Sequence, residues 1–171
     1  MAYRTRTYLA ADWTTDIEVI DKLRSWNDSD YWGLSFTDAH DLMQSKDTSL
    51  NCSIKSSLGD RMDASKTFVL VVGTKTKTLK AGSCYYCKDY DFDKHGCKHG
   101  WSTSSKSFIE YECDKAKRDG LKIVVLYNSG YVFKDRCPDS LKDEGRHIAA
   151  FHWEGSTKKW NYTNIKSAIM N

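Results

Sequence analysis

The chain has 171 residues, of which 40% are hydrophobic and 29% are charged, and it contains a single proline. This length suits one domain over residues 1–171, and the composition excludes a disordered tail or a disulfide scaffold. The 26 Lys and Arg residues exceed the 23 Asp and Glu residues by a net +3, with both signs mixed along the sequence. We therefore expect no binding to nucleic acid.

Residues 1–13 contain no apolar stretch long enough for a secretory signal, and no window of the chain approaches the length of a membrane span. We expect a cytoplasmic protein that does not associate with membranes. The six cysteines are then expected to be free thiols or metal ligands, because a chain of this size folds without disulfides.

The first third of the chain predicts a strand, a tight turn and a helix. Residues 5–11 form a β-type run, and Thr15 and Glu18 have the three-residue offset of a capping box. The helix that starts there ends at residues 27–30, and its apolar stripe consists of Val19, Ile20, Leu23 and Trp26. Residues 33–37 indicate a short second strand, and residues 38–49 indicate a loop.

The middle of the chain carries the clearest patterns. A second helix follows from apolar residues at four-residue steps, namely Leu50, Ile54, Leu58 and Met62. Residues 67–72 are apolar without alternation, which is typical of a strand buried on both faces of a parallel sheet. Residues 74–106 then show no periodic signal, which is unusually long for a connection in a compact α/β domain, so this segment is predicted to be an insertion.

After this segment the sequence again predicts helices and strands. Ser107 and Glu110 have the capping-box offset, and Gly120 stands where a helix end favours glycine. The buried face of this helix is predicted to consist of Ile109, Cys113 and Ala116. Residues 121–127 predict another central strand and residues 148–151 an edge strand. A short final helix carries Ile165, Ala168 and Ile169.

This order predicts a doubly wound α/β fold: a mostly parallel, five-stranded sheet of flavodoxin-like type with helices on both faces. Ligands of such sheets bind beyond the carboxyl ends of the strands. The residues predicted at this rim are Asp12, Trp13, Asp38, Thr74, Thr76 and the start of the helix that bears Glu112.

Three segments of the sequence, YLAADWTTD, FVLVVGTKT and FIEYECDKA, together resemble the TIR-like domains of the ThsB proteins of bacterial Thoeris anti-phage systems. The resemblance covers most of residues 4–127 and includes the aromatic-acidic pair Tyr111-Glu112. It implies a TIR-like fold and an enzyme that cleaves NAD at the nicotinamide–ribose bond. It also implies that the remainder of NAD becomes a small signalling nucleotide for a separate effector. Residues 129–171 are interpreted from pattern alone.

The resemblance implies that Glu112 is the catalytic carboxylate, since a carboxylate beside the ribose stabilises the positive charge that develops when the C–N bond breaks. The competing interpretation is a surface glutamate that pairs with Lys115. Substrate contacts are expected from the rim residues Asp12, Trp13, Asp38, Thr74 and Thr76 and from Tyr111. Asp12 and Trp13 also fit a helix-starting turn with a core tryptophan, and Thr74 and Thr76 fit ordinary turn chemistry.

The insertion contains Cys84, Cys87, Cys97 and His99, whose spacing indicates a structural zinc site, with His95 as a substitute for His99. The competing interpretation is a mobile loop with reduced thiols. The remaining cysteines, Cys52, Cys113 and Cys137, are expected to be ordinary thiols, and we assign no role to His147 and His152.

A non-catalytic interaction domain is the alternative function, because TIR-type folds also serve as self-associating adaptors, and a homo-oligomer is consistent with either function. The turn after the first strand contains no glycine, so a Gly-x-Gly-x-x-Gly dehydrogenase and a flavin-binding domain are disfavoured. A phospho-acceptor receiver domain would carry an aspartate after the third strand, where this chain has Gly73-Thr74.

Overall fold

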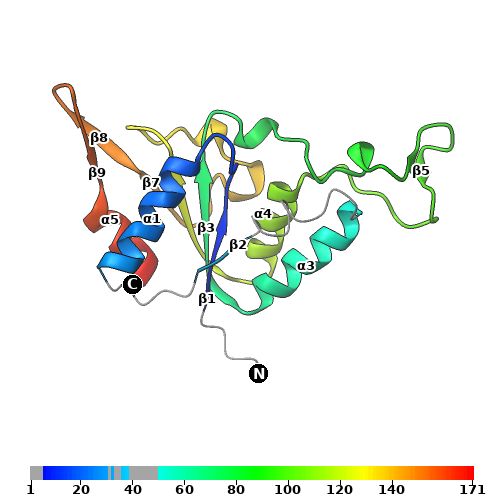
Figure 1. Cartoon of the computed structure of the whole chain (residues 1–171), viewed down its shortest axis with the longest axis horizontal. Coiled ribbons are helices and arrows are strands. Elements are labelled where there is room, and N and C mark those ends of the chain that lie inside the picture. Colours follow the sequence, from blue (N-terminus) through cyan, green and yellow to red (C-terminus); the bar gives the residue numbers. More distant parts are fainter. Residues whose placement is uncertain (1–5, 31, 33–35, 39–49) are drawn as a thin grey trace.

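A computed structural model describes residues 6–30, 32, 36–38 and 50–171, with residues 36–38 described in their backbone only (Figure 1). The predicted loop over residues 38–49 begins one residue too early, because Asp38 belongs to a strand, and residues 39–49 lie outside the described residues. Among the described residues, no helix has the length and apolar character needed to cross a bilayer.

The centre of the fold is a parallel sheet of five strands in the order β2-β1-β3-β6-β7. The strands are β1 (Arg6–Ala10), β2 (Phe36–Asp38), β3 (Ser65–Val72), β6 (Lys122–Tyr127) and β7 (Arg146–Ala149). All neighbouring pairs run parallel, so the carboxyl ends of the strands meet at one edge. The predicted α/β fold is confirmed, including its flavodoxin-like strand order.

Helices cover both faces of this sheet, as Figure 1 shows. The helices α1 (Ile17–Ser29) and α5 (Tyr162–Met170) pack on one face, and α3 (Asn51–Asp63) and α4 (Phe108–Arg118) pack on the other. Successive residues of β3 alternate between the two cores: Phe68, Leu70 and Val72 face α3 and α4, whereas Val69 and Val71 face α1 and α5. Burial on both faces explains why this strand is apolar without alternation.

The two predicted capping boxes have different outcomes. The box at Thr15 and Glu18 is wrong, because α1 begins one residue after Asp16 and the Thr15 hydroxyl donates to Asp12 Oδ2 (2.6 Å) instead. The box at the start of α4 is confirmed: Ser107 Oγ accepts from Glu110 N (3.1 Å), and Glu110 Oε2 accepts from Ser107 N (2.7 Å).

The end of α4 is also fixed by its sequence. Gly120 has φ +67°, a left-handed conformation that glycine adopts without strain. The N–H groups of Gly120 and Leu121 donate to the carbonyls of Lys117 and Ala116, which is the Schellman pattern that ends many helices. Because both ends are capped, α4 starts and stops at defined residues, and the positions of its side chains follow.

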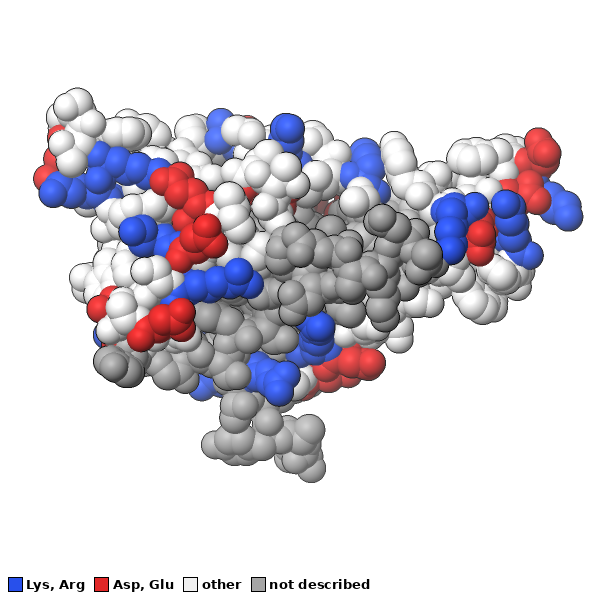
Figure 2. All heavy atoms as spheres, viewed as in Figure 1, with Lys and Arg blue, Asp and Glu red and all other residues white. Residues whose placement is uncertain are grey.

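Two regions contain structure that the sequence patterns did not predict. Residues 74–106, called the flap below, contain the 3₁₀ turns Thr76–Thr78 and Cys84–Tyr86 and a small antiparallel pair, β4 (Tyr90–Asp91) and β5 (Gly96–Cys97). The flap projects from the sheet at the right of Figure 1, and Figure 2 shows both charge signs mixed on it. The predicted edge strand ends at Ala149, and the chain then forms the hairpin β8 (Phe151–Glu154) and β9 (Thr157–Trp160).

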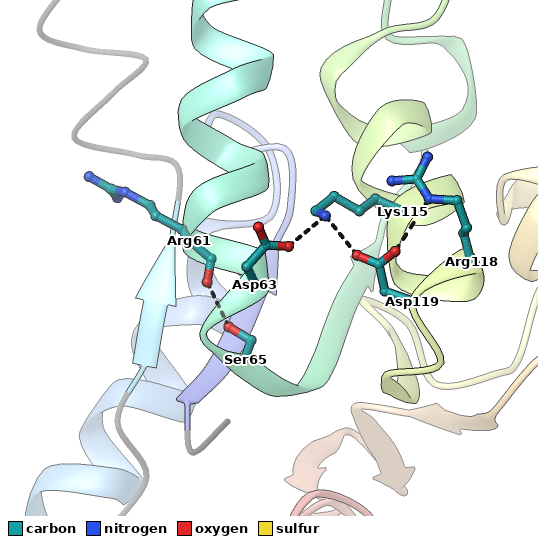
Figure 3. A network of polar contacts seen from close by, with 6 residues as sticks. All are labelled: Arg61, Asp63, Ser65, Lys115, Arg118 and Asp119. Carbon is teal, nitrogen blue, oxygen red and sulfur yellow. Dashed lines mark hydrogen bonds and ion pairs between the residues drawn. The ribbon is translucent and has the colours of Figure 1, made fainter. Parts of the chain in front are cut away.

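A polar network joins α3 to α4 at the end of the sheet opposite the flap (Figure 3). The Lys115 ammonium donates to Asp63 Oδ1 (2.7 Å) and to Asp119 Oδ2 (2.6 Å), while its side chain is only 10% exposed. Burial alone would lower the pKa of Lys115, but the hydrogen bonds with Asp119 and Asp63 raise it above its ordinary value. The network therefore keeps Lys115 charged and holds the two helices together.

We predict that Lys115→Ala lowers the free energy of unfolding by about 1–3 kcal/mol, because it leaves Asp63 and Asp119 facing each other without their shared partner. Lys117→Ala is the matched control: it lies on the same helix, and its ion pair with Glu144 (2.9 Å) is half exposed. The control is expected to change stability by at most about 0.5 kcal/mol in urea titrations. Equal losses in the two variants would contradict this account of the network.

Candidate active site

A cavity of about 650 Å³, counted with its opening to solvent, lies at the carboxyl edge of the sheet. Its wall comes from three segments: the turn after β1, the start of the flap and the first turns of α4. The lining residues are Ala11, Asp12, Trp13, Thr14, Leu79, Ala81, Ser107, Phe108, Ile109 and Glu112. Three of the residues predicted for the site, Asp12, Trp13 and Glu112, therefore lie around one cavity.

The flap is tied to α4 where the two meet at this cavity. The Phe108 N–H donates to the carbonyl of Ala81 (2.8 Å), which fixes the flap to the first residue of the helix. Phe108 and Leu79 both pack with the core on the α3 and α4 face. The cavity wall is therefore continuous with the core rather than formed by a detached loop.

The Asp12 carboxylate shapes the turn between β1 and α1. Oδ1 accepts from the Thr14 N–H (3.0 Å), and Oδ2 accepts from the Thr15 hydroxyl (2.6 Å). The Asp12 carbonyl also accepts from the Asp16 N–H (2.9 Å). With both carboxylate oxygens engaged in local bonds, Asp12 holds the turn in place at the edge of the cavity.

Trp13 is partly buried and packs at the margin of the core under α1. The Arg24 guanidinium lies over its ring, 5.0 Å from the centroid, which is a cation–π arrangement. Trp13 thus packs against the core, as its alternative interpretation expected, and its indole also borders the cavity. An aromatic ring held in this way at a cavity wall can stack on a flat ligand.

Glu112 is the most unusual residue of the cavity. Its side chain is 2% exposed, and Oε2 has no hydrogen-bond partner among the described residues. Burial raises its pKa to about 8, and the opposing effect of a hydrogen bond with Tyr8 is smaller. A carboxyl group buried beside a cavity without an ion-pair partner is typical of a functional site.

The alternative interpretation of Glu112 as a surface residue paired with Lys115 is wrong. The Lys115 ammonium binds Asp63 and Asp119 at the far end of α4. Because positions 112 and 115 are three residues apart on one helix, the sequence alone allowed both a Glu112–Lys115 ion pair and a Glu112 side chain in the site. Burial of Glu112 decides against it.

The sequence patterns missed Asp16, a second buried carboxyl at the same edge of the sheet. It is 1% exposed, and Oδ1 accepts from the Asn128 side chain (2.9 Å), which follows β6. A Cβ atom at Gly73, which follows β3, would lie 2.1 Å from Asp16 Oδ1, so glycine is required there. Burial raises the pKa of Asp16. Asp16 thereby connects the residues that follow β1, β3 and β6, which are far apart in the sequence.

Thr74, Thr76 and Tyr111, which were also predicted for the site, do not line the cavity. Thr76 is buried, and its hydroxyl accepts from the Gly73 N–H (2.8 Å), which is the turn chemistry that was left open. Thr74 is exposed in the same turn. Tyr111 packs toward α3, where a Cβ at Gly59 would lie 2.8 Å from its hydroxyl. Asp38 ends β2 at this edge of the sheet, and its side chain lies outside the described part of the structure.

The predicted zinc ligands do not converge as the spacing suggested. His99 Nε2 lies 2.8 Å from Asp89 Oδ2, and its ring stacks on Trp101. In the described residues no group of three or more His, Cys, Asp or Glu side chains is arranged to hold a metal ion. All six cysteines are free; Cys113 and Cys137 are buried and Cys52 is exposed.

The two histidines without an assigned role have partners. His147 Nδ1 lies 2.7 Å from the Tyr127 hydroxyl, and His152 Nδ1 lies 2.6 Å from Asn161 Oδ1. The first pair joins β6 to β7, and the second joins β8 to the residue after β9. The hydrogen bonds of both histidines therefore stabilise the edge of the sheet and the hairpin beside it.

Comparison with known families gives one result. Residues 7–81 match the model described as "Thoeris protein ThsB, TIR-like domain". The matched range includes the turn with Asp12 and Trp13 and the end of β3, and it stops before α4 and Glu112. No curated protein matches the chain. Residues 7–81 are therefore similar to a TIR-like domain of the Thoeris ThsB family, and the parallel α/β sheet agrees with that similarity.

Proposed function

We propose that this protein is an NAD-cleaving enzyme of bacterial anti-phage defence. It breaks the nicotinamide–ribose bond of NAD and releases an ADP-ribose-derived signalling nucleotide that acts on a separate effector. The observation that carries the proposal is the buried carboxyl of Glu112, which has no ion-pair partner among the described residues and lies at the wall of a rim cavity that Trp13 also lines. The free state of all six cysteines supports a cytoplasmic location.

Cleavage of the nicotinamide–ribose bond requires mainly a negatively charged group of the protein close to the ribose. As the bond between ribose C1′ and the nicotinamide nitrogen breaks, its electron pair goes to the pyridinium ring, which leaves as a neutral molecule. Positive charge develops on the ribose, and an oxygen or nitrogen nucleophile then takes the C1′ position. An ionised Glu112 stabilises this charge, and the effect is strong because the carboxylate lies in a site with little water.

The raised pKa of Glu112 is compatible with this role. In the free protein the carboxyl is mostly protonated at neutral pH, because its pKa is about 8. NAD carries a positive nicotinamide ring, and an adjacent positive charge favours the ionised form of a carboxyl. Substrate binding is therefore expected to ionise Glu112 at the moment when its charge is needed.

The rest of the cavity supplies contacts of the right kind for a dinucleotide. The Trp13 indole offers a flat apolar surface for a base or for nicotinamide. Apolar side chains from the start of the flap and from the first turn of α4, Leu79 and Phe108, also line the cavity.

We predict that the purified protein releases nicotinamide from NAD and that Glu112→Gln lowers kcat by about 100-fold or more, because the amide cannot carry a negative charge. Nicotinamide release is measured by chromatography, and mass spectrometry identifies the nucleotide product. Glu154→Gln, which changes an exposed glutamate of the β8–β9 hairpin, is the control and is expected to retain full activity. Full activity in Glu112→Gln would contradict the site, and absence of turnover in the wild type would favour the non-catalytic interaction domain.

We also predict the pH dependence of the reaction. Since burial raises the Glu112 pKa to about 8, the reactive ionised form becomes more abundant as the pH rises toward that value. The ratio kcat/KM, which reports the free enzyme, is expected to rise by about tenfold per pH unit from pH 6 and to level off above pH 8. A profile that is flat from pH 6 to pH 9 would show that the group with the raised pKa is not the one that acts.

A further inference from the structure

A second cavity, of about 340 Å³ with its opening, lies between the first turn of α3 and the flap. Four of the six cysteines line it: Cys52 from α3, and Cys84, Cys87 and Cys97 from the flap. None of the four is buried, so each sulfur is accessible to a reagent or an ion from solvent. The sequence spacing brought together three of these cysteines and did not include Cys52.

The face of α3 that carries Cys52 is attached to the flap on both sides of that residue. The Asn51 side chain donates to the carbonyl of Ser83 (2.9 Å), next to Cys84. The Lys55 ammonium donates to the carbonyl of Lys106 (2.7 Å) at the other end of the flap. Because residues 52 and 55 are three apart on a helix, they lie on the same face, and Cys52 is directed toward the flap.

The three flap cysteines are set by a turn followed by a short antiparallel pair. The Cys87 N–H donates to the carbonyl of Cys84 (3.0 Å), which closes the turn between them. The chain then continues into β4, where Tyr90 is the register partner of Cys97 in β5. The Cys-x-x-Cys turn and the hairpin thus bring the third cysteine close to the first two. This arrangement suits tetrahedral metal binding.

Two polar groups lie beside the sulfurs that line the cavity. The Ser104 N–H donates to Cys84 Sγ (3.1 Å). The Lys55 side chain, 8% exposed, lies close enough to Cys84 and Cys52 for their charges to act on it. Burial lowers the pKa of Lys55, and negative charge on the two sulfurs acts in the opposite direction. The cavity therefore has a cation and a backbone N–H donor beside its sulfurs.

We propose that Cys52, Cys84, Cys87 and Cys97 bind one Zn²⁺ as four thiolates. His99 is not a ligand, because its ring is held by Asp89 and Trp101. Since no three of the described side chains stand in ligating geometry, the sulfurs must move toward one another when zinc binds. The four thiols release their protons as they bind the ion.

Such a site is structural, because four protein ligands leave no open position on the metal. It would fasten the flap to α3 beside the two hydrogen bonds that the Asn51 and Lys55 side chains donate to it. Leu79 and Ala81, at the start of the flap, form part of the wall of the Glu112 cavity. Zinc would thereby fix that wall without touching the substrate.

The test is a metal titration of the full chain, reduced and stripped of metal with a chelator. Co²⁺ is added first, and the visible absorption of tetrahedral, thiolate-bound Co²⁺ is followed to its end point. We expect one equivalent to bind and Zn²⁺ to displace it. Cys52→Ser and Cys87→Ser are expected to lower the Zn²⁺ affinity by about 100-fold or more, since each removes a ligand.

His99→Ala is the matched control and is expected to bind Zn²⁺ as the wild type does. Circular dichroism checks that each variant is folded, and the exposed position of Cys52 makes its replacement by serine readily tolerated. Wild-type affinity in Cys52→Ser, or a loss in His99→Ala as large as that in Cys87→Ser, would overturn the proposed ligand set. Absence of stoichiometric Co²⁺ binding to the wild type would overturn the site altogether.

Discussion

The structure at the carboxyl edge of the sheet depends on keeping one carboxyl group, that of Glu112, buried. A buried carboxyl without an ion-pair partner is unfavourable in its ionised form, and a mobile helix would release it to water. Helix α4 does not release it, because the Ser107 capping box fixes its start, Gly120 fixes its end and Lys115 fastens it to α3. The stability of the rest of the domain offsets the unfavourable burial at this position, as is usual for functional sites.

The cavity exists because three segments that are distant in the sequence meet over the end of the sheet. Asp12 holds the turn after β1, Asp16 connects that turn to the residues that follow β3 and β6, and Ala81 binds the start of α4. The two carboxyl groups of the first turn thus organise the backbone, and Glu112 remains the carboxyl that is available for chemistry. In this arrangement the flap contributes one wall, so its attachment to α3 bears on the shape of the cavity.

The sheet, its strand order and the helix positions could be predicted because they rest on local signals: apolar strands, four-residue spacings and the α4 capping box. The prediction of a capping box at Thr15 and Glu18 was wrong because the Thr15 hydroxyl binds Asp12 instead. This competition depends on the conformation of the folded turn. Asp16 and Cys52 were missed for a related reason, since their importance comes from Asn128 and from the flap, which lie far along the chain. Spacing placed His99 with the cysteines, whereas its contacts with Asp89 and Trp101 turn it away.

The central claim, that folding buries the Glu112 carboxyl in its neutral form, is tested most directly by the stability of the wild type relative to Glu112→Gln at several pH values. The folded-state pKa of about 8 lies above the ordinary value of 4.5, so ionisation favours the unfolded chain between these two values. From pH 5 to pH 8 the wild type is predicted to lose about 1.4 kcal/mol per pH unit relative to the variant in urea titrations, and then to level off. A difference that does not change with pH would contradict the claim.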